Sequence, residues 1–179
     1  PAKARAYAYS DGAIDLGGRR SLLPPRTLAL LLQAADVNAN DRVLDIGCGT
    51  GYAAAILATM AKAVVALESD PELASEARAN LAALKASNVE VATGALEAGL
   101  SGKAPYDVIL VEGGVDQVPE AILAQLSQNG RLVAIDVAGG PPGCAIVVTK
   151  SGSAYAQRTV FNAGAPVLPG FEKPAAFVF

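Results

Sequence analysis

Three glycines alternate within five residues of the sequence VLDIGCGTGY, which occupies positions 43–52. Glycine permits positive φ angles and lets a ligand approach the main chain without meeting a Cβ atom. The apolar run before Gly47 is typical of a buried strand, and the Ala- and Leu-rich stretch 52–61 predicts a helix. Ligands of open parallel sheets bind beyond the carboxyl ends of the strands. The alternation of Gly47, Gly49 and Gly51 therefore indicates a ligand site rather than a turn that merely needs glycine.

Two carboxylates accompany this glycine turn. Asp45 ends the first strand and can bind or orient a cationic group such as an ammonium. Glu68 ends the next apolar run, 68 − 51 = 17 residues after Gly51, where a carboxylate can accept both hydroxyls of a ribose. Tyr52 departs from the pattern G-x-G-x-x-G of dinucleotide sites, and no G-K-[ST] tripeptide of a phosphate loop occurs. We expect a nucleoside ligand that carries an ammonium, with a nicotinamide-dependent oxidoreductase as the weaker alternative.

Composition narrows the chemistry. The 179 residues are 52% apolar and 17% charged, the net charge is -3, and there is no histidine. The missing histidine excludes catalytic triads with an imidazole base and most zinc sites, and we expect no metal. Without a basic run, neither nucleic acid nor a membrane surface is an expected partner. The longest apolar stretch, 52–67, contains Lys62 and is shorter than the ~20 residues of a membrane span.

The same composition bears on the compartment and on the ends of the chain. Two distant cysteines, Cys48 and Cys144, predict neither a disulfide framework nor a metal knuckle, and no signal peptide is evident, so we expect a cytoplasmic protein. The chain begins at Pro1 without a methionine, so a preceding segment may be missing and we treat the N-terminal boundary as unreliable.

The remaining sequence predicts the elements that must position these residues. Strands and helices alternate through the first two thirds, which favours a parallel sheet covered by helices, and short turns then link strands that we expect to be antiparallel at one edge. We predict one domain over 1–179, with an arm and helix at 1–35 and the sheet core at 42–179. The expected strands are 42–46, 63–67, 88–92, 106–111, 131–135, 144–149, 154–161 and 175–179. The expected helices are 24–35, 52–61, 71–84 (with Ser69 or Asp70 as N-cap) and 118–128, the last stopped by Gly130.

The glycine turn with Glu68 resembles the S-adenosylmethionine site of class I methyltransferases. The resemblance extends to the protein-L-isoaspartate O-methyltransferase family through ALE at 66–68, NVEV at 88–91 with Gly94, YDVILV at 106–111, QLSQNGRLV at 125–133 and the arm AIDLGG at 13–18. It implies a three-layer Rossmann-like α/β fold, S-adenosyl-L-methionine as cofactor, and methyl transfer to a peptide or protein that carries an isoaspartyl or other carboxylate acceptor, as in protein repair. The cofactor-binding residues that it implies are Asp45, Gly47, Cys48, Gly49, Thr50, Gly51, Glu68, Ser69, Ala95, Leu96 and Glu112.

The sequence departs from the family pattern in three places. Where the family has Thr-Ile-Ser-Gln-Pro, this chain has SLLPP at 21–25, so Leu23 replaces the serine beside the methyl donor and Ser21 becomes the catalytic candidate. Ala95 replaces an aspartate that faces the adenine, and a Glu112-Gly-Gly segment replaces a small polar one. These departures keep two alternatives open: a catalytically idle S-adenosylmethionine-binding protein, and a methyltransferase with a different acceptor.

Several side chains near these motifs have two interpretations. A carboxylate acceptor is already ionised and needs no general base, which agrees with the missing histidine. Glu112 is either a base, a solvated loop acid or a cofactor-side acceptor, and Tyr52 either covers the cofactor or starts the helix as a core aromatic. Cys48 is expected to be a small packing residue rather than a nucleophile. Arg19 and Arg20 are expected to be solvated, the alternative being a pairing with an acidic substrate.

Overall fold

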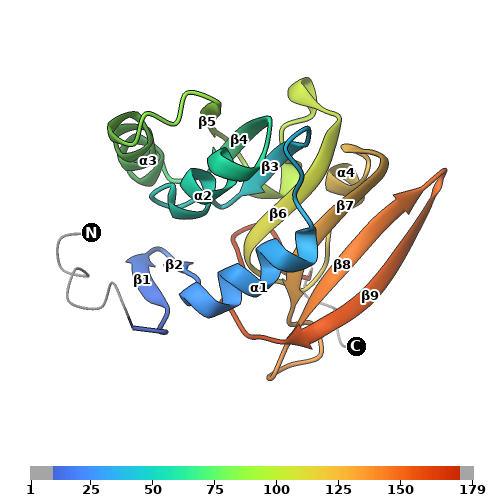
Figure 1. Cartoon of the computed structure of the whole chain (residues 1–179). Helices are drawn as coiled ribbons and strands as arrows, with labels where there is room; N and C mark the ends of the chain where they lie inside the picture. Colours follow the sequence, from blue (N-terminus) through green and yellow to red (C-terminus); the bar gives the residue numbers. More distant parts are fainter. Residues whose placement is uncertain (1–9, 174–179) are drawn as a thin grey trace.

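The computed structural model describes residues 10–173, and a seven-stranded sheet lies at the centre of this part of the chain (Figure 1). The predicted strand at 175–179 and the first nine residues of the arm lie outside the described residues. In spatial order the strands are β5 (Val89–Thr93), β4 (Ala63–Glu68), β3 (Arg42–Ile46), β6 (Tyr106–Val115), β7 (Leu126–Asp136), β8 (Cys144–Ser151) and β9 (Ala154–Asn162).

Strand direction reverses twice across this sheet, at β8 and again at β9. The strands from β5 to β7 are parallel, whereas β8 pairs antiparallel with β7 and β9 pairs antiparallel with β8. The chain runs outward from β3 through β4 to β5 and then returns to place β6 on the other side of β3. Such a reversal leaves a crevice at the carboxyl ends of the two central strands, where ligands of α/β sheets bind. The predicted α/β architecture with antiparallel edge strands is confirmed.

Three helices cover one face of the sheet: α1 (Pro25–Ala35), α2 (Tyr52–Met60) and α3 (Pro71–Ala83). Alternate strand residues such as Val43, Val108 and Val133 pack in the same core cluster as the buried leucines of α1. The helix α3 begins where predicted, because the side chain of Asp70 accepts hydrogen bonds from the N–H groups of Glu72 and Leu73.

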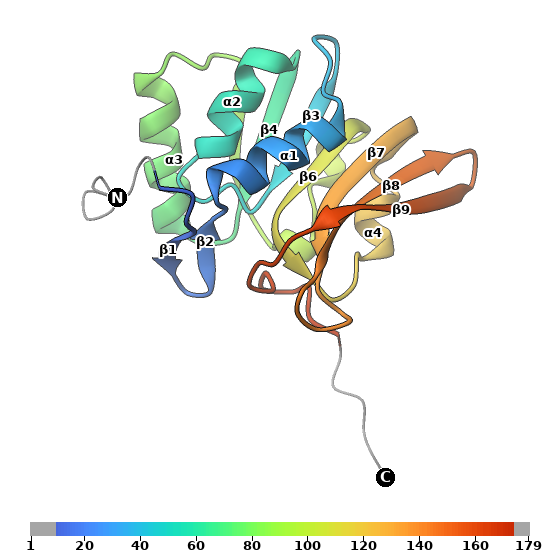
Figure 2. The same ribbon diagram turned by 60° about the horizontal axis from the view of Figure 1, so that its bottom comes forward.

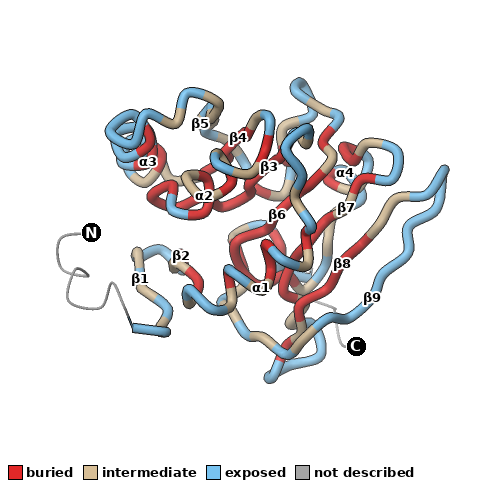
Figure 3. The backbone as a smooth tube through the Cα atoms, viewed as in Figure 1, coloured by how far each residue is buried: buried red, intermediate tan, exposed pale blue. Residues whose placement is uncertain are grey.

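The opposite face is covered more thinly. The short helix α4 (Glu120–Leu123) and the 3₁₀ turns η2 (Leu96–Ala98) and η3 (Ser101–Lys103) lie on this side, together with the segment 163–173. Leu168 and Phe171 of that segment are buried against strand residues such as Ile46 and Val111. Figure 3 shows the resulting buried centre, while β9 at the sheet edge is exposed along most of its length. Among residues 10–173, every helix is too short or too polar to cross a membrane.

The predicted helix at 118–128 is wrong in extent. Only 120–123 are helical, and β7 already begins at Leu126, which pairs with Tyr106. Gln125 is buried, and its side chain donates to the carbonyls of Ala98 and Ala121 and accepts from the N–H of Leu100. These bonds fix the chain to the 3₁₀ turns and end the helix early. Gly130, predicted as a helix stop, therefore lies inside a strand.

Within the arm, residues 14–22 form a small β-hairpin of β1 (Ile14–Gly17) and β2 (Arg20–Leu22). The hairpin lies beside the carboxyl ends of the central strands, next to the start of α1 (Figure 2). A Cβ atom at Gly49 would lie 2.9 Å from Cδ1 of Leu16 and 3.5 Å from Cδ2 of Leu22. The hairpin thus packs directly on the glycine turn that follows β3.

Candidate functional site

The glycine turn connects β3 to α2 and is held from both sides by main-chain hydrogen bonds. The N–H of Gly47 donates to the carbonyl of Leu67 at the end of β4 (2.8 Å), and the N–H of Gly51 donates to the carbonyl of Cys48 (2.8 Å). Gly47, Gly49 and Gly51 all have φ angles between 54° and 87°. Residues with a Cβ rarely adopt such angles, so the alternating glycines are required by the backbone path itself.

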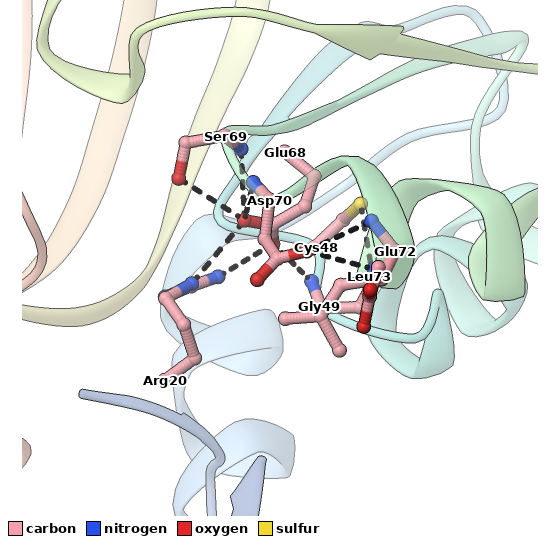
Figure 4. A network of polar contacts seen from close by, with 8 residues as sticks. All are labelled: Arg20, Cys48, Gly49, Glu68, Ser69, Asp70, Glu72 and Leu73. Atoms are coloured by element: carbon pink, nitrogen blue, oxygen red, sulfur yellow. Dashed lines mark hydrogen bonds and ion pairs between the residues drawn. The ribbon is translucent and has the colours of Figure 1, made fainter. Parts of the chain in front are cut away.

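Glu68 ends β4 beside this turn and is completely buried. Its Oε1 accepts from the N–H groups of Ser69 (2.8 Å) and Asp70 (3.1 Å) and from the Ser69 hydroxyl (3.3 Å). Its Oε2 accepts from the N–H of Gly49 (2.8 Å). Arg20 of β2 completes the set, with Nε 3.3 Å from Oε1 and Nη2 2.7 Å from Oε2 (Figure 4).

Arg20 is only 3% exposed, so the prediction that both adjacent arginines are solvated is wrong for this residue. Arg19 is exposed and pairs with Glu172, as a hairpin surface residue can. Burial by itself would raise the pKa of Glu68, but the hydrogen bonds and charge of Arg20, with the N–H groups of Asp70 and Gly49, hold that pKa below its ordinary value. Glu68 is therefore an ionised carboxylate that is neutralised by a buried guanidinium.

Asp45 in β3 and Glu112 in β6 form a second buried acidic pair, 0% and 2% exposed. Each carboxyl group affects the pKa of the other. Burial is the main cause that raises the pKa of Asp45 to about 7, and burial with the neighbouring Asp45 charge raises the pKa of Glu112 well above its usual range. Both oxygens of Asp45 and Oε1 of Glu112 have no hydrogen-bond partner among the described residues.

The remaining predicted cofactor residues line the same corner of the sheet. Thr50 and Cys48 are buried within the turn, and Ser69 follows Glu68. Burial, followed by the charges of the nearby acids, raises the pKa of the Cys48 thiol, which agrees with a packing role rather than a nucleophilic one. Tyr52 is 44% exposed and is therefore not the core aromatic of one interpretation. Whether it covers a cofactor stays a prediction.

Ala95 and Leu96 lie on the loop after β5, and the N–H of Gly94 donates to the carbonyl of Glu68 (3.0 Å). This bond brings the loop to the end of β4; Ala95 is exposed there and Leu96 is buried in the core. Leu23 is 4% exposed and packs in the core with α1, which explains a leucine where the family pattern has serine. Ser21 is half-buried in β2, one residue after Arg20.

Sequence reasoning missed two side chains that close the site, Arg20 and Leu168. A Cβ atom at Gly47 would lie 2.9 Å from Nη2 of Arg20 and 3.2 Å from Cδ1 of Leu168. Leu168 also explains the glycine after Glu112, because a Cβ at Gly113 would lie 2.5 Å from Leu168 Cγ. In the sequence, the Gly113-Gly114 pair near the end of β6 was the signal that another segment approaches closely here. It did not show that this segment contains residue 168, which is remote in sequence. Within the described residues no cluster of three or more metal-ligating side chains occurs.

Comparison with known proteins places this geometry in a family. The model of the protein-L-isoaspartate(D-aspartate) O-methyltransferase family matches residues 1–158. The chain belongs to this family. A protein-L-isoaspartate O-methyltransferase of Methylorubrum populi is 43% identical over 143 residues, which are 80% of this chain and 66% of that protein. The protein of the same name from Methanoregula boonei is 39% identical over 153 residues, 86% of this chain and 70% of that protein.

A solved structure named protein-L-isoaspartate O-methyltransferase superposes on the chain with a TM-score of 0.82 at 28% identity, covering 92% of this chain and 55% of the solved one. The chain thus spans between about half and two thirds of the length of several family members that it matches. Family membership and the class I methyltransferase fold, both predicted from the glycine turn and the arm, are confirmed.

Proposed function

We propose that this chain is an S-adenosylmethionine-dependent methyltransferase that transfers a methyl group to a carboxylate, in particular that of an isoaspartyl residue in a peptide or protein. The observation that carries the proposal is the convergence of Asp45, Glu68 and Glu112 around the glycine turn. These three acids end, or nearly end, adjacent parallel strands at the crevice between β3 and β6. Family membership supports the same activity.

The residues of the site fit such a donor. The unpartnered oxygens of Asp45 and Glu112 suit the donor's ammonium, and the Glu68 carboxylate suits a ribose diol. Because residues 47, 49 and 51 are glycines, a donor can approach the main chain of the turn without meeting a Cβ atom there. Ala95 and Leu96 offer backbone groups and an apolar edge for the base. We also propose cofactor-binding roles for further residues in and beside the turn, namely Gly47, Cys48, Gly49, Thr50, Gly51 and Ser69.

When bound, the donor supplies a sulfonium-activated methyl group that leaves in an in-line displacement. The chain's task is then to hold donor and acceptor in contact and to keep water out. Leu168 and the hairpin leucines Leu16 and Leu22 lie over the turn and provide apolar cover. An ionised acceptor carboxylate needs no base, and Glu112, whose pKa burial raises well above its usual range, is suited to hydrogen bonding rather than to proton abstraction. The half-buried hydroxyl of Ser21 is our candidate for orienting the acceptor.

The acceptor and the setting are further parts of the proposal. Relatives from two prokaryotes carry the isoaspartate name, which supports a protein or peptide partner with an isoaspartyl residue. The free thiols of Cys48 and Cys144 suit a reducing compartment, and we place the activity in the cytoplasm.

A second candidate function is binding of the donor without catalysis. It is favoured by Leu23, because this buried leucine carries no hydroxyl at the position of the family's serine. Ser21 then carries the one hydroxyl on β2 that could contact an acceptor. The two functions differ in turnover, not in donor affinity.

Calorimetry with S-adenosyl-L-homocysteine tests the donor site. Asp45→Asn keeps the shape of the side chain but removes its charge, and loss of one charge-assisted hydrogen bond of about 1.5–3 kcal/mol weakens binding at least tenfold. Glu120→Gln, on the exposed start of α4, is the matched control and leaves the affinity unchanged. A wild-type chain that binds no nucleoside, or an Asp45→Asn variant that binds equally well, contradicts the assignment.

Radiolabelled donor tests the acceptor. We expect label in a peptide with one isoaspartyl residue and none in the same peptide with an ordinary aspartyl residue. A chain that binds the donor but labels neither this peptide nor a panel of other carboxylates supports the idle function, and label only in another carboxylate redefines the acceptor.

A further inference from the structure

The Glu68 carboxylate has no remaining capacity for a ribose. It accepts six hydrogen bonds, two of them from Arg20 and the others from Gly49, Ser69 and Asp70 (Figure 4). A carboxylate offers only about four lone-pair sites. Two additional hydroxyl donors therefore cannot be accommodated unless existing ones leave.

Among the contacts to Glu68, those from Arg20 are the pair that can be exchanged without rebuilding the fold. Three of the other four bonds come from main-chain N–H groups of the glycine turn and of the β4–α3 connection, and the fourth from the adjacent Ser69 hydroxyl. Arg20 instead reaches Glu68 across 48 residues of sequence through a flexible side chain. It makes two hydrogen bonds, one to each carboxylate oxygen, which is the number that a ribose diol would need.

The guanidinium also takes up the space over the turn. Its Nη1 and Nη2 would lie 3.3 and 2.9 Å from a Cβ at Gly47, so it covers the main chain that a bound donor would approach. Nη1 is buried without a hydrogen-bond partner among the described residues. A buried donor group without a partner is costly, and the ion pair is therefore incompletely compensated in the closed arrangement.

Resting on the proposed function, we infer that Arg20 competes with the ribose of the methyl donor for Glu68 and latches the β1–β2 hairpin over an otherwise ready site. Donor binding exchanges the Arg20–Glu68 ion pair for ribose–Glu68 hydrogen bonds. The hairpin is then held less tightly, and because Ser21 follows Arg20, the exchange releases the acceptor-side segment when the donor arrives.

Substitution of Arg20 by methionine tests the competition. Arg20→Met keeps an aliphatic stem to cover the turn but removes the guanidinium, while four hydrogen bonds to Glu68 remain. We expect S-adenosyl-L-homocysteine to bind Arg20→Met at least about tenfold more tightly than the wild-type chain in calorimetry. Arg26→Met, which removes an exposed arginine from the first turn of α1, is the matched charge control and leaves the affinity unchanged.

Equal or weaker binding by Arg20→Met, with a wild-type chain that binds, overturns the competition and leaves the proposed function intact. A wild-type chain and an Arg20→Met variant that are folded but both fail to bind overturn the proposed function and this inference with it. Should Arg20→Met not fold, hydrogen exchange of the wild-type chain decides. Faster exchange of amides 14–22 on addition of S-adenosyl-L-homocysteine, with slower exchange at 47–51, supports the latch, and unchanged or slower exchange of the hairpin overturns it.

Discussion

Replacement of Glu112 by glutamine should stabilise the protein at neutral pH, although it removes one carboxyl group of the buried Asp45–Glu112 pair. Burial and the neighbouring Asp45 raise the pKa of Glu112 well above its ordinary value of 4.5, which favours the protonated carboxyl in the folded chain. In the unfolded chain the same carboxyl is ionised above pH 4.5. The unfolded state therefore binds fewer protons, and the free energy of unfolding falls as the pH rises through this range. Glutamine is neutral in both states and has nearly the same shape as glutamate.

The magnitude follows from the pH and not from the size of the pKa shift. The largest cost at pH 7 is that of a Glu112 that becomes fully protonated on folding, about 2.5 pH units above 4.5, which is about 3 kcal/mol at 1.36 kcal/mol per unit. At pH 5 the same cost is below about 1 kcal/mol. We expect Glu112→Gln to gain up to about 3 kcal/mol at pH 7 and little at pH 5, so that the difference between the two proteins grows with pH.

Urea unfolding of both proteins between pH 5 and pH 7.5, at equal m-values, measures this difference. Glu120→Gln is the control, because the Glu120 carboxyl is exposed to water in the folded chain as well as in the unfolded chain. A Glu112→Gln protein whose stability relative to wild type is independent of pH, or is lower at pH 7, would show that Glu112 is ionised in the fold and would refute the reasoning.

Two further changes test how the site is built. Gly113→Ala places a Cβ 2.5 Å from Leu168 Cγ and should lower the free energy of unfolding by about 1–3 kcal/mol, whereas Gly102→Ala, with open space around it, should change it by less than about 0.5 kcal/mol in the same urea assay. Asp70→Ala removes the N-cap of α3 and should cost about 1 kcal/mol, and Asp70→Ser should restore most of it; equal stabilities of the two variants would contradict the capping role.

The parallel strands and the glycine turn could be predicted from the sequence because local pattern determines them. The run 63–67 is apolar throughout and the run 42–46 is apolar except for Arg42 and Asp45, as in strands that are buried on both faces. The alternating glycines have few other uses. The start of α3 was equally local, since Asp70 and Pro71 lie at the positions where helices begin. At these places the fold is fixed by residues that are neighbours in the chain.

The errors lie where remote residues decide. Nothing in the local pattern of 118–128 indicates that Gln125 is fixed to η2 and η3, and helix propensity is overruled there by those hydrogen bonds. An arginine pair on a loop likewise predicts two solvated side chains. Arg20 is buried because it pairs with Glu68, which is 48 residues away and cannot be recognised as its partner from the local pattern. The apolar cover from Leu168 depends on contacts between β6 and the segment 163–173, which share an isolated bridge at Gly114 and Val167.

The charge balance of the site gives a reason for a buried arginine at this position. Three acids at the ends of adjacent strands cannot all be ionised and buried without compensation. The Arg20 guanidinium compensates Glu68, and burial raises the pKa values of Asp45 and Glu112, which favours their neutral forms. A nucleoside that carries an ammonium would bring its cation to the acidic pair and its diol hydrogen bonds to Glu68. The Arg20–Glu68 ion pair that compensates the buried charge in the absence of such a ligand is then the contact that the ligand must displace. Stability and donor affinity therefore oppose each other at Arg20.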